Sequence, residues 1–181
     1  MSDGRHRLSH VDDQGAARMV DVSAKSASKR RATAAGTVHT TPEVVGLIAN
    51  GDLPKGDALA TARVAGILAA KRTSDLIPLC HQIALSSVDV DFEIGSGAIE
   101  VSATAHTTDR TGVEMEALTA CSVAALTVYD MCKSSDRAMV IGDIALWEKT
   151  GGRSGPYRRD PSATLGDQVL DEPYRGEPLD D

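Results

Sequence analysis

The segment 111–133 contains charged residues at its two ends and none in its middle, a spacing that could serve acid–base chemistry. Glu116 lies near its beginning, Asp130 and Lys133 lie at its end, and the thirteen residues between Glu116 and Asp130 are uncharged. The two acids are fourteen positions apart, or ~21 Å along a helix, too far to grip one small reacting group within one chain. Antiparallel copies around a two-fold axis would bring the beginning of one helix towards the end of the other. The spacing therefore predicts a site shared by two subunits.

Each of these residues also has a purely structural interpretation. Thr111 followed by Glu114 matches a capping box, in which two side chains satisfy main-chain amides at a helix start. Glu116 suits a first helical turn because the helix dipole favours acids there. Asp130 and Lys133 have the spacing of an ordinary helical ion pair. Spacing alone leaves both interpretations open.

A lysine and a Cys-His pair outside this segment are further candidates. Lys55 precedes a predicted helix start, where it is either a solvated loop residue or a cation aimed at phosphate. Cys80 and His81 follow a proline, but no second Cys or His lies nearby at a zinc-ligand spacing, so no metal site is predicted. Neighbouring side chains in an extended segment rarely point together, which disfavours a catalytic Cys-His pair. We expect His81 to contact a substrate instead.

The elements that must position these residues are read from hydrophobic periodicity and from cap and turn residues. We predict strands over 17–23, 30–40 and 138–150, helices over 41–51, 57–71 and 111–133, and a hairpin over 86–107. From residue 30 onward this is the βαββαβ order of a ferredoxin-like α+β domain. We expect an antiparallel sheet with helices on one face, an additional N-terminal strand and a doubled first helix.

Composition restricts how such a domain can be built. The 181 residues suffice for one domain, and with only 3% aromatic residues its core must consist of Ala, Val, Ile and Leu. The uncharged part of segment 111–133 is apolar on every side, so it needs cover on two faces. The sheet can cover one face, and a second copy of the chain is the natural cover for the other. We therefore expect a homo-oligomer.

The net charge of −7 is concentrated at the C-terminal end. From residue 160 onward there are seven acids and one base, which leaves the remainder nearly neutral and free to form a basic pocket. We expect a flexible N-terminus over 1–9, a single catalytic domain over 10–158, and an acidic, disordered tail over 159–181. With no membrane-length apolar run, no signal peptide and three unpaired cysteines, we expect a cytoplasmic protein without a membrane or nucleic-acid partner.

Four long stretches between residues 8 and 155 carry a resemblance to a known family. They are LSHVDDQGAARMVDVSAK, KGDALATARVAGILAAKRTSDLIPLCH, TGVEMEALTACSVAALTVYDMCK and GGRSG. In this order they resemble MoaC, the cyclic pyranopterin monophosphate synthase family of molybdenum cofactor biosynthesis. The resemblance implies a phosphorus–oxygen lyase that converts (8S)-3′,8-cyclo-7,8-dihydroguanosine 5′-triphosphate to cyclic pyranopterin monophosphate and diphosphate. It also implies a hexamer, a trimer of dimers, with sites between subunits.

The resemblance further implies roles for individual residues. The catalytic positions of the family match Lys55, Asp130 and Lys133. Substrate-contacting positions match Leu79, Cys80, His81, Met115 and Glu116, and basic pocket positions match Arg30, Lys71 and Lys149. Arg153 stands where a lysine is expected, which keeps the charge and changes its geometry. No cofactor is implied, although Mg²⁺ can accompany the triphosphate.

The chemistry of these residues fits the implied reaction. Clustered cations lower a lysine's pKa, and a lysine tuned in this way can act as a general acid or base near neutral pH. Two other functions remain open: a zinc-dependent pterin enzyme related in task to GTP cyclohydrolase, and an inactive oligomer that only binds nucleotides or a partner enzyme. Stoichiometric zinc would favour the first, and tight substrate binding without diphosphate release would favour the second.

Overall fold

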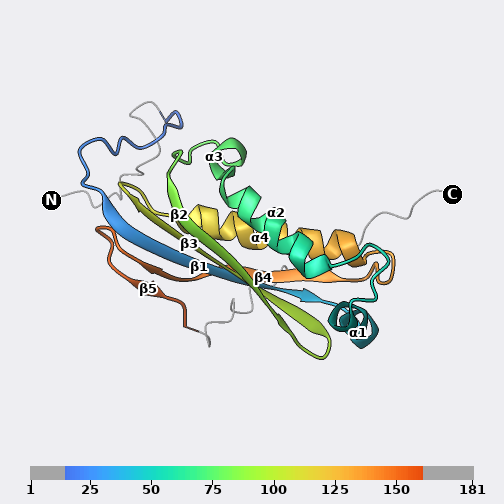
Figure 1. Cartoon of the computed structure of the whole chain (residues 1–181). Coiled ribbons are helices and arrows are strands. Elements are labelled where there is room, and N and C mark those ends of the chain that lie inside the picture. The colour runs from blue at the N-terminus through green and yellow to red at the C-terminus, as the bar shows by residue number, and fades with distance from the viewer. Residues whose placement is uncertain (1–14, 161–181) are drawn as a thin grey trace.

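A computed structural model describes residues 15–160 of the chain, and these build one sheet covered by helices (Figure 1). In chain order the elements are β1 (Ser28–His39), α1 (Pro42–Asn50), α2 (Ala58–Ala70), α3 (Thr73–Leu76), β2 (Leu85–Ile94), β3 (Ala98–Asp109), α4 (Glu114–Cys132), β4 (Val140–Thr150) and β5 (Tyr157–Arg158). The predicted flexible N-terminus over 1–9, and all but the first two residues of the predicted tail, lie outside the described residues.

The sheet has the strand order β2-β3-β1-β4-β5, and all its pairs are antiparallel. The first four strands in this order form the ferredoxin-like arrangement that the βαββαβ pattern predicts, with β5 added at one edge. The alternation within β2 and β3 correctly predicted their hairpin, in which Val90 lies opposite Ala103 and Phe92 opposite Val101. The α+β prediction is therefore confirmed, and the doubled first helix is present as α1 and α2.

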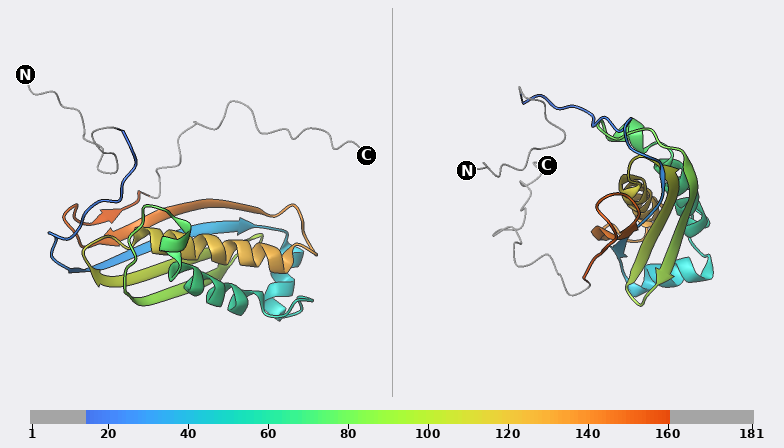
Figure 2. Two further views of the ribbon diagram at one scale, coloured as in Figure 1. Left: turned by 90° about the horizontal axis from the view of Figure 1, so that it is seen from above. Right: turned by 90° about the vertical axis from the view of Figure 1, so that its left-hand side faces the viewer.

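Small residues allow α2 and α4 to pack closely on the same face of the sheet (Figure 2). A Cβ atom added at Gly66 of α2 would lie 2.9 Å from the carbonyl oxygen of Ala120 and 3.3 Å from the Cβ of Ala124, both in α4. Larger side chains would push the two backbones apart. The buried hydrophobic core contains no aromatic residue, as the composition predicts. On the outer side of α4, Leu126 is 58% exposed.

The cap residues begin and end the shorter helices as their sequence predicts. The Thr41 side chain accepts a hydrogen bond from the Val44 amide, and Asp57 accepts one from the Ala60 amide. Gly51 ends α1 with φ 74°, a left-handed conformation that glycine adopts without strain. These caps fix the connection between α1 and α2.

Two local predictions are wrong. Segment 17–23 forms no strand and holds only an isolated bridge at Ala17. A hydrogen bond from the Ser23 amide to the Asp21 side chain, and a turn between Val22 and Lys25, bend the chain at the end of this segment. The predicted capping box is also absent: Val113 is the N-cap of α4 and no side chain caps it.

None of the helices in the described part of the chain is both long enough and apolar enough to cross a membrane.

Candidate active site

Lys55, Asp130 and Lys133 lie in direct contact at the C-terminal end of α4. The Lys55 ammonium donates hydrogen bonds to Oδ2 of Asp130 at 2.9 Å and to the Asp130 carbonyl oxygen at 2.6 Å. The Lys133 ammonium lies 2.7 Å from Oδ1 of the same carboxylate. All three side chains are between 39% and 56% exposed, so the cluster is open to solvent or to another molecule. The helical ion pair thus forms, and Lys55 joins it from a distant segment.

The loop between α1 and α2 brings Lys55 to this position. Leu53 is buried and anchors the loop on the core, and Asp57 caps α2 just beyond it. Gly56 between them has φ 88°, a conformation that an L side chain would strain. The free carbonyl groups at a helix end then accept the lysine's hydrogen bond.

The ion pairs around Asp130 shift its pKa and the pKa of Lys133 in opposite directions. Hydrogen bonds from Lys133 and then Lys55 lower the pKa of Asp130 to about 2. The same hydrogen bond and charge raise the pKa of Lys133. At neutral pH Asp130 is therefore ionised and Lys133 is protonated, and the raised pKa makes Lys133 a weaker acid than a free lysine. The prediction that neighbouring cations lower the lysine's pKa is wrong for Lys133 within one subunit, because its nearest charge is the carboxylate.

The other predicted contact residues gather at the opposite end of α4. A cavity of about 510 Å³ is lined by all five of them: Leu79, Cys80, His81, Met115 and Glu116. The ring Nε2 of His81 lies 2.7 Å from the carbonyl oxygen of Val20. Since a carbonyl oxygen can only accept, Nε2 carries the proton. Segment 17–23, predicted as a strand, instead lies beside His81 and contributes Val20 and Val22 to the cavity wall.

Glu116 is the most unusual titratable group in this cavity. It is only 4% exposed, and burial, followed by the charge of Glu114, raises its pKa to about 7. Burial and the charge of Glu116 also raise the pKa of the Cys80 thiol, so that thiol stays protonated. A carboxyl group with a pKa near 7 can give or take a proton at neutral pH. The sequence could not predict this raised pKa, because the burial of Glu116 depends on tertiary packing.

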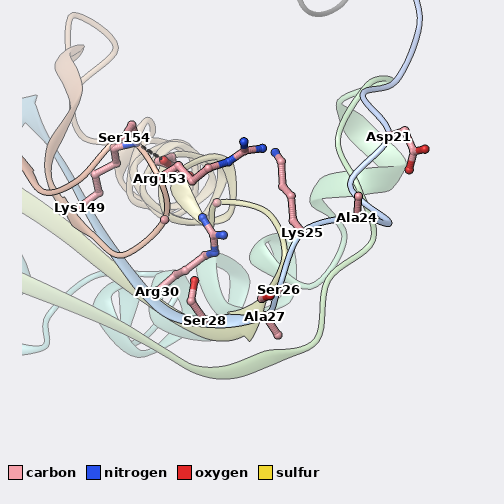
Figure 3. Close-up of a pocket in the computed structure, with 13 residues that line it drawn as sticks. Asp21, Ala24, Lys25, Ser26, Ala27, Ser28, Arg30, Lys149, Arg153 and Ser154 are labelled. Carbon is pink, nitrogen blue, oxygen red and sulfur yellow. Dashed lines mark hydrogen bonds and ion pairs between the residues drawn. The ribbon is translucent and has the colours of Figure 1, made fainter.

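A second, basic cavity of about 840 Å³ adjoins the first and shares Lys25, Gly112 and Glu114 with it. Figure 3 shows Lys25 and Arg153 extending into it from opposite sides, with Arg30 and Lys149 also on its wall. These four cations suit a ligand with several negative charges.

The wall of the basic cavity is held in place by main-chain groups. Nε of Arg30 donates to the carbonyl oxygen of Asp109 at 2.9 Å, and its Nη2 donates to that of Arg110 at 3.1 Å. Gly152 has φ 79°, and a Cβ atom there would lie 2.4 Å from Nη1 of Arg30. Glycine at this point of the GGRSG loop therefore lets the loop approach the guanidinium group.

The structure thus brings the predicted residues together in two groups and leaves one apart. Lys71 is exposed at the end of α2 and lines neither cavity. Lys25 was missed, because nothing in its local sequence distinguishes it from a surface lysine.

Within residues 15–160, no three or more His, Cys, Asp or Glu side chains gather as metal ligands, and the prediction of no bound metal stays a prediction.

These observations define a ferredoxin-like α+β protein with a basic cavity and two separate clusters of titratable side chains. Comparison with protein-family models matches residues 19–152 to the MoaC family. The chain therefore belongs to the MoaC family.

Individual relatives agree with this assignment over most of their length. Cyclic pyranopterin monophosphate synthase 2 of Mycobacterium tuberculosis is 64% identical over 152 residues, which cover 84% of this chain and 91% of the relative. Cyclic pyranopterin monophosphate synthase of Streptomyces griseus is 58% identical over 155 residues, which cover 86% of this chain and 88% of the relative. Cyclic pyranopterin monophosphate synthase 3 of M. tuberculosis is 58% identical over 160 residues, with coverage of 88% and 90%.

Proposed function

We propose that this protein is a cyclic pyranopterin monophosphate synthase of molybdenum cofactor biosynthesis. It converts (8S)-3′,8-cyclo-7,8-dihydroguanosine 5′-triphosphate to cyclic pyranopterin monophosphate and diphosphate. Family membership supports this activity, and so do the names of relatives that are 58–64% identical. The observation that carries it in the structure is the pair of adjoining cavities, one basic and one with a buried carboxyl group.

The two cavities suit the two parts of such a substrate. The triphosphate fits the basic cavity, where Lys25, Arg30, Lys149 and Arg153 offset its charge. The heterocycle fits the neighbouring cavity, whose wall combines apolar side chains with His81 and Glu116. A neutral Glu116 can donate a hydrogen bond or a proton to a ring atom, and its raised pKa keeps it partly neutral at pH 7.

A complete site needs a second subunit. Lys55, Asp130 and Lys133 lie at the far end of α4 from both cavities, ~21 Å from Glu116 by helix rise. A general acid or base must come within ~3 Å of the atom it serves. An antiparallel α4 from another copy, packed over the exposed Leu126 face, places that copy's lysines above these cavities. We propose a dimeric unit with two such sites, within the hexamer that the family resemblance implies.

In this arrangement the lysines and the basic cavity perform different tasks. Lys133, an ammonium at neutral pH, donates a proton to the substrate during the rearrangement, and Lys55 shares its partner carboxylate, Asp130. Cyclic phosphate formation requires a substrate hydroxyl to attack the α-phosphorus while the bond to the bridging oxygen breaks. Diphosphate leaves with that electron pair, and the cations of the basic cavity stabilise its charge.

We further propose that no resident cofactor takes part and that Mg²⁺, where present, enters with the triphosphate. A cytoplasmic location is proposed on the three cysteines, all of which are free thiols.

The test is to incubate the purified protein with the cyclised GTP intermediate and to identify the products by mass spectrometry. We expect one cyclic pyranopterin monophosphate and one diphosphate for each substrate consumed. Substrate that is bound and recovered unchanged would refute the activity and favour a binding protein. Activity that appears only with stoichiometric zinc would favour the zinc-dependent alternative.

A further inference from the structure

Glu114 is a negatively charged residue on the wall between the two cavities, and the proposed reaction gives it no role. It lines both the basic cavity and its neighbour. Its Oε1 lies 3.0 Å from the Lys149 ammonium, and the two side chains are only 27% and 22% exposed. The carboxylate therefore forms a largely buried ion pair in a cavity whose other charged lining residues are three further cations and Asp21.

The surroundings of Glu114 fix this position. A Cβ atom added at Gly112 would lie 1.7 Å from Oε2 of Glu114, so the carboxylate packs directly against the Gly112 backbone. The Lys149 ammonium is also held by the Ser154 hydroxyl at 2.9 Å. Glu114 makes no capping hydrogen bond at the start of α4, although the sequence suggests one. Its contacts are thus directed at Lys149.

A carboxylate at this place has a defined effect on an incoming phosphate group. It repels the phosphate directly, because like charges a few ångströms apart raise the energy of both. It also occupies Lys149, so a phosphate oxygen must displace the carboxylate before it can bind that ammonium. When the phosphate leaves, the same carboxylate is available to take back the ammonium.

We propose that Glu114 is an internal counter-ion that positions Lys149 and competes with phosphate oxygens for it, which weakens the retention of diphosphate. The inference rests on the proposed function, since it concerns the release of that reaction's diphosphate product. Glu114 is a positioning residue in this scheme, acting through Lys149.

Inorganic diphosphate is the probe, and its binding to the full-length protein is measured by titration calorimetry at fixed low ionic strength. Glu114→Gln keeps the size of the side chain and an oxygen that can accept from Lys149, but removes the charge. We expect this variant to bind diphosphate about tenfold more tightly, a difference of about 1.4 kcal/mol. The advantage should shrink as salt is added, because added ions screen the charge that the variant lacks.

Glu148→Gln is the matched control. Glu148 precedes Lys149 in β4, so its side chain points to the opposite face of the sheet, where it pairs with Arg31. This variant makes the same change in net charge outside the cavities, and its diphosphate affinity should stay within about twofold of the wild type. Thermal unfolding and oligomer size are compared first, because loss of an acid at a helix start can lower stability without any effect on phosphate.

Each outcome decides the question. Equal or weaker diphosphate binding by a folded Glu114→Gln variant would overturn the counter-ion role, and so would equal tightening by Glu148→Gln. If Glu114→Gln does not assemble, Glu114→Ser removes the same charge with a smaller side chain and should show the same tightening. These results leave the proposed function untouched, because mass analysis of the wild-type products tests it separately.

Discussion

Mixed oligomers of two inactive variants test whether each site takes residues from two chains. Lys55→Ala removes a cation from one end of α4, and Glu116→Ala removes the buried carboxyl group near the other end. Each variant alone should be inactive, because every site in its oligomer lacks one group. A mixed dimer contains one chain of each variant. One of its two sites takes Glu116 from the Lys55→Ala chain and Lys55 from the Glu116→Ala chain, so this site is intact. The other site takes the alanine from each chain.

The expected recovery follows from this geometry. Random pairing of equal amounts makes half of the dimers mixed, and half of the sites in a mixed dimer are intact. The mixture should therefore regain about one quarter of wild-type activity, as the two-fold symmetry of such an interface requires. If each site belonged to one chain, no intact site would form and activity would stay at the level of the separate variants.

The assay is diphosphate release from the cyclised GTP intermediate, measured after subunit exchange that native mass spectrometry has verified with tagged chains. The reciprocal control mixes wild type with a chain that carries both substitutions. Mixed dimers then contain no intact site, so the activity from the wild-type input should fall to about one half. No recovery in the first mixture, with exchange proven, would refute the shared site.

Three further predictions concern the chemistry of the site. Lys55→Arg and Lys133→Arg should still bind the substrate but lose ~10²- to 10⁴-fold in turnover, because a guanidinium group does not release its proton. Near-normal turnover in both variants would mean that these lysines only contact phosphate. The kcat/KM of the wild type should fall as the pH rises through about 7, because Glu116 loses its proton there. Glu116→Gln should lack this step in its pH profile, and a step that persists would belong to another group. Exhaustive chelation, followed by assay in otherwise unchanged buffer, should leave turnover largely intact; activity that only zinc restores would contradict this.

The sequence predicts the sheet and the main helices because their signals are local and repeated. Alternation over ten or more residues determines β2 and β3, and polar caps such as Asp57 determine where α2 begins. Segment 17–23 has a similar but shorter alternation. A strand also needs a free partner edge, which sequence alternation cannot reveal, and this segment bends across the start of α4 instead. Local patterns therefore fail where a tertiary contact decides the conformation.

In the candidate site, too, contacts that depend on local spacing could be predicted, and contacts that depend on tertiary structure could not. The pairing of Asp130 with Lys133 follows from helical spacing, and their separation from Glu116 predicts two groups at opposite ends of one helix. The contact between Lys149 and Glu114 could not be predicted, because the residues are 35 positions apart and meet only when β4 pairs with β1 beside α4. The role of Lys25 has the same origin, since the bend in its segment places it on both cavities.

Because α4 is one continuous helix, its length between Glu116 and Asp130 restricts which insertions and deletions the chain can accept. A helix turns by about 100° and advances by about 1.5 Å with each residue. One residue inserted or deleted between Glu116 and Asp130 would therefore rotate the lysine cluster a quarter turn or more away from the direction of the carboxyl group. Substitutions on this stretch change local packing and leave the direction of its two ends unchanged, whereas a change in its length alters the relative orientation of both halves of every site. An insertion of about seven residues, near two full turns, would restore the orientation to within about 20°, and it would lengthen the separation by about 10 Å.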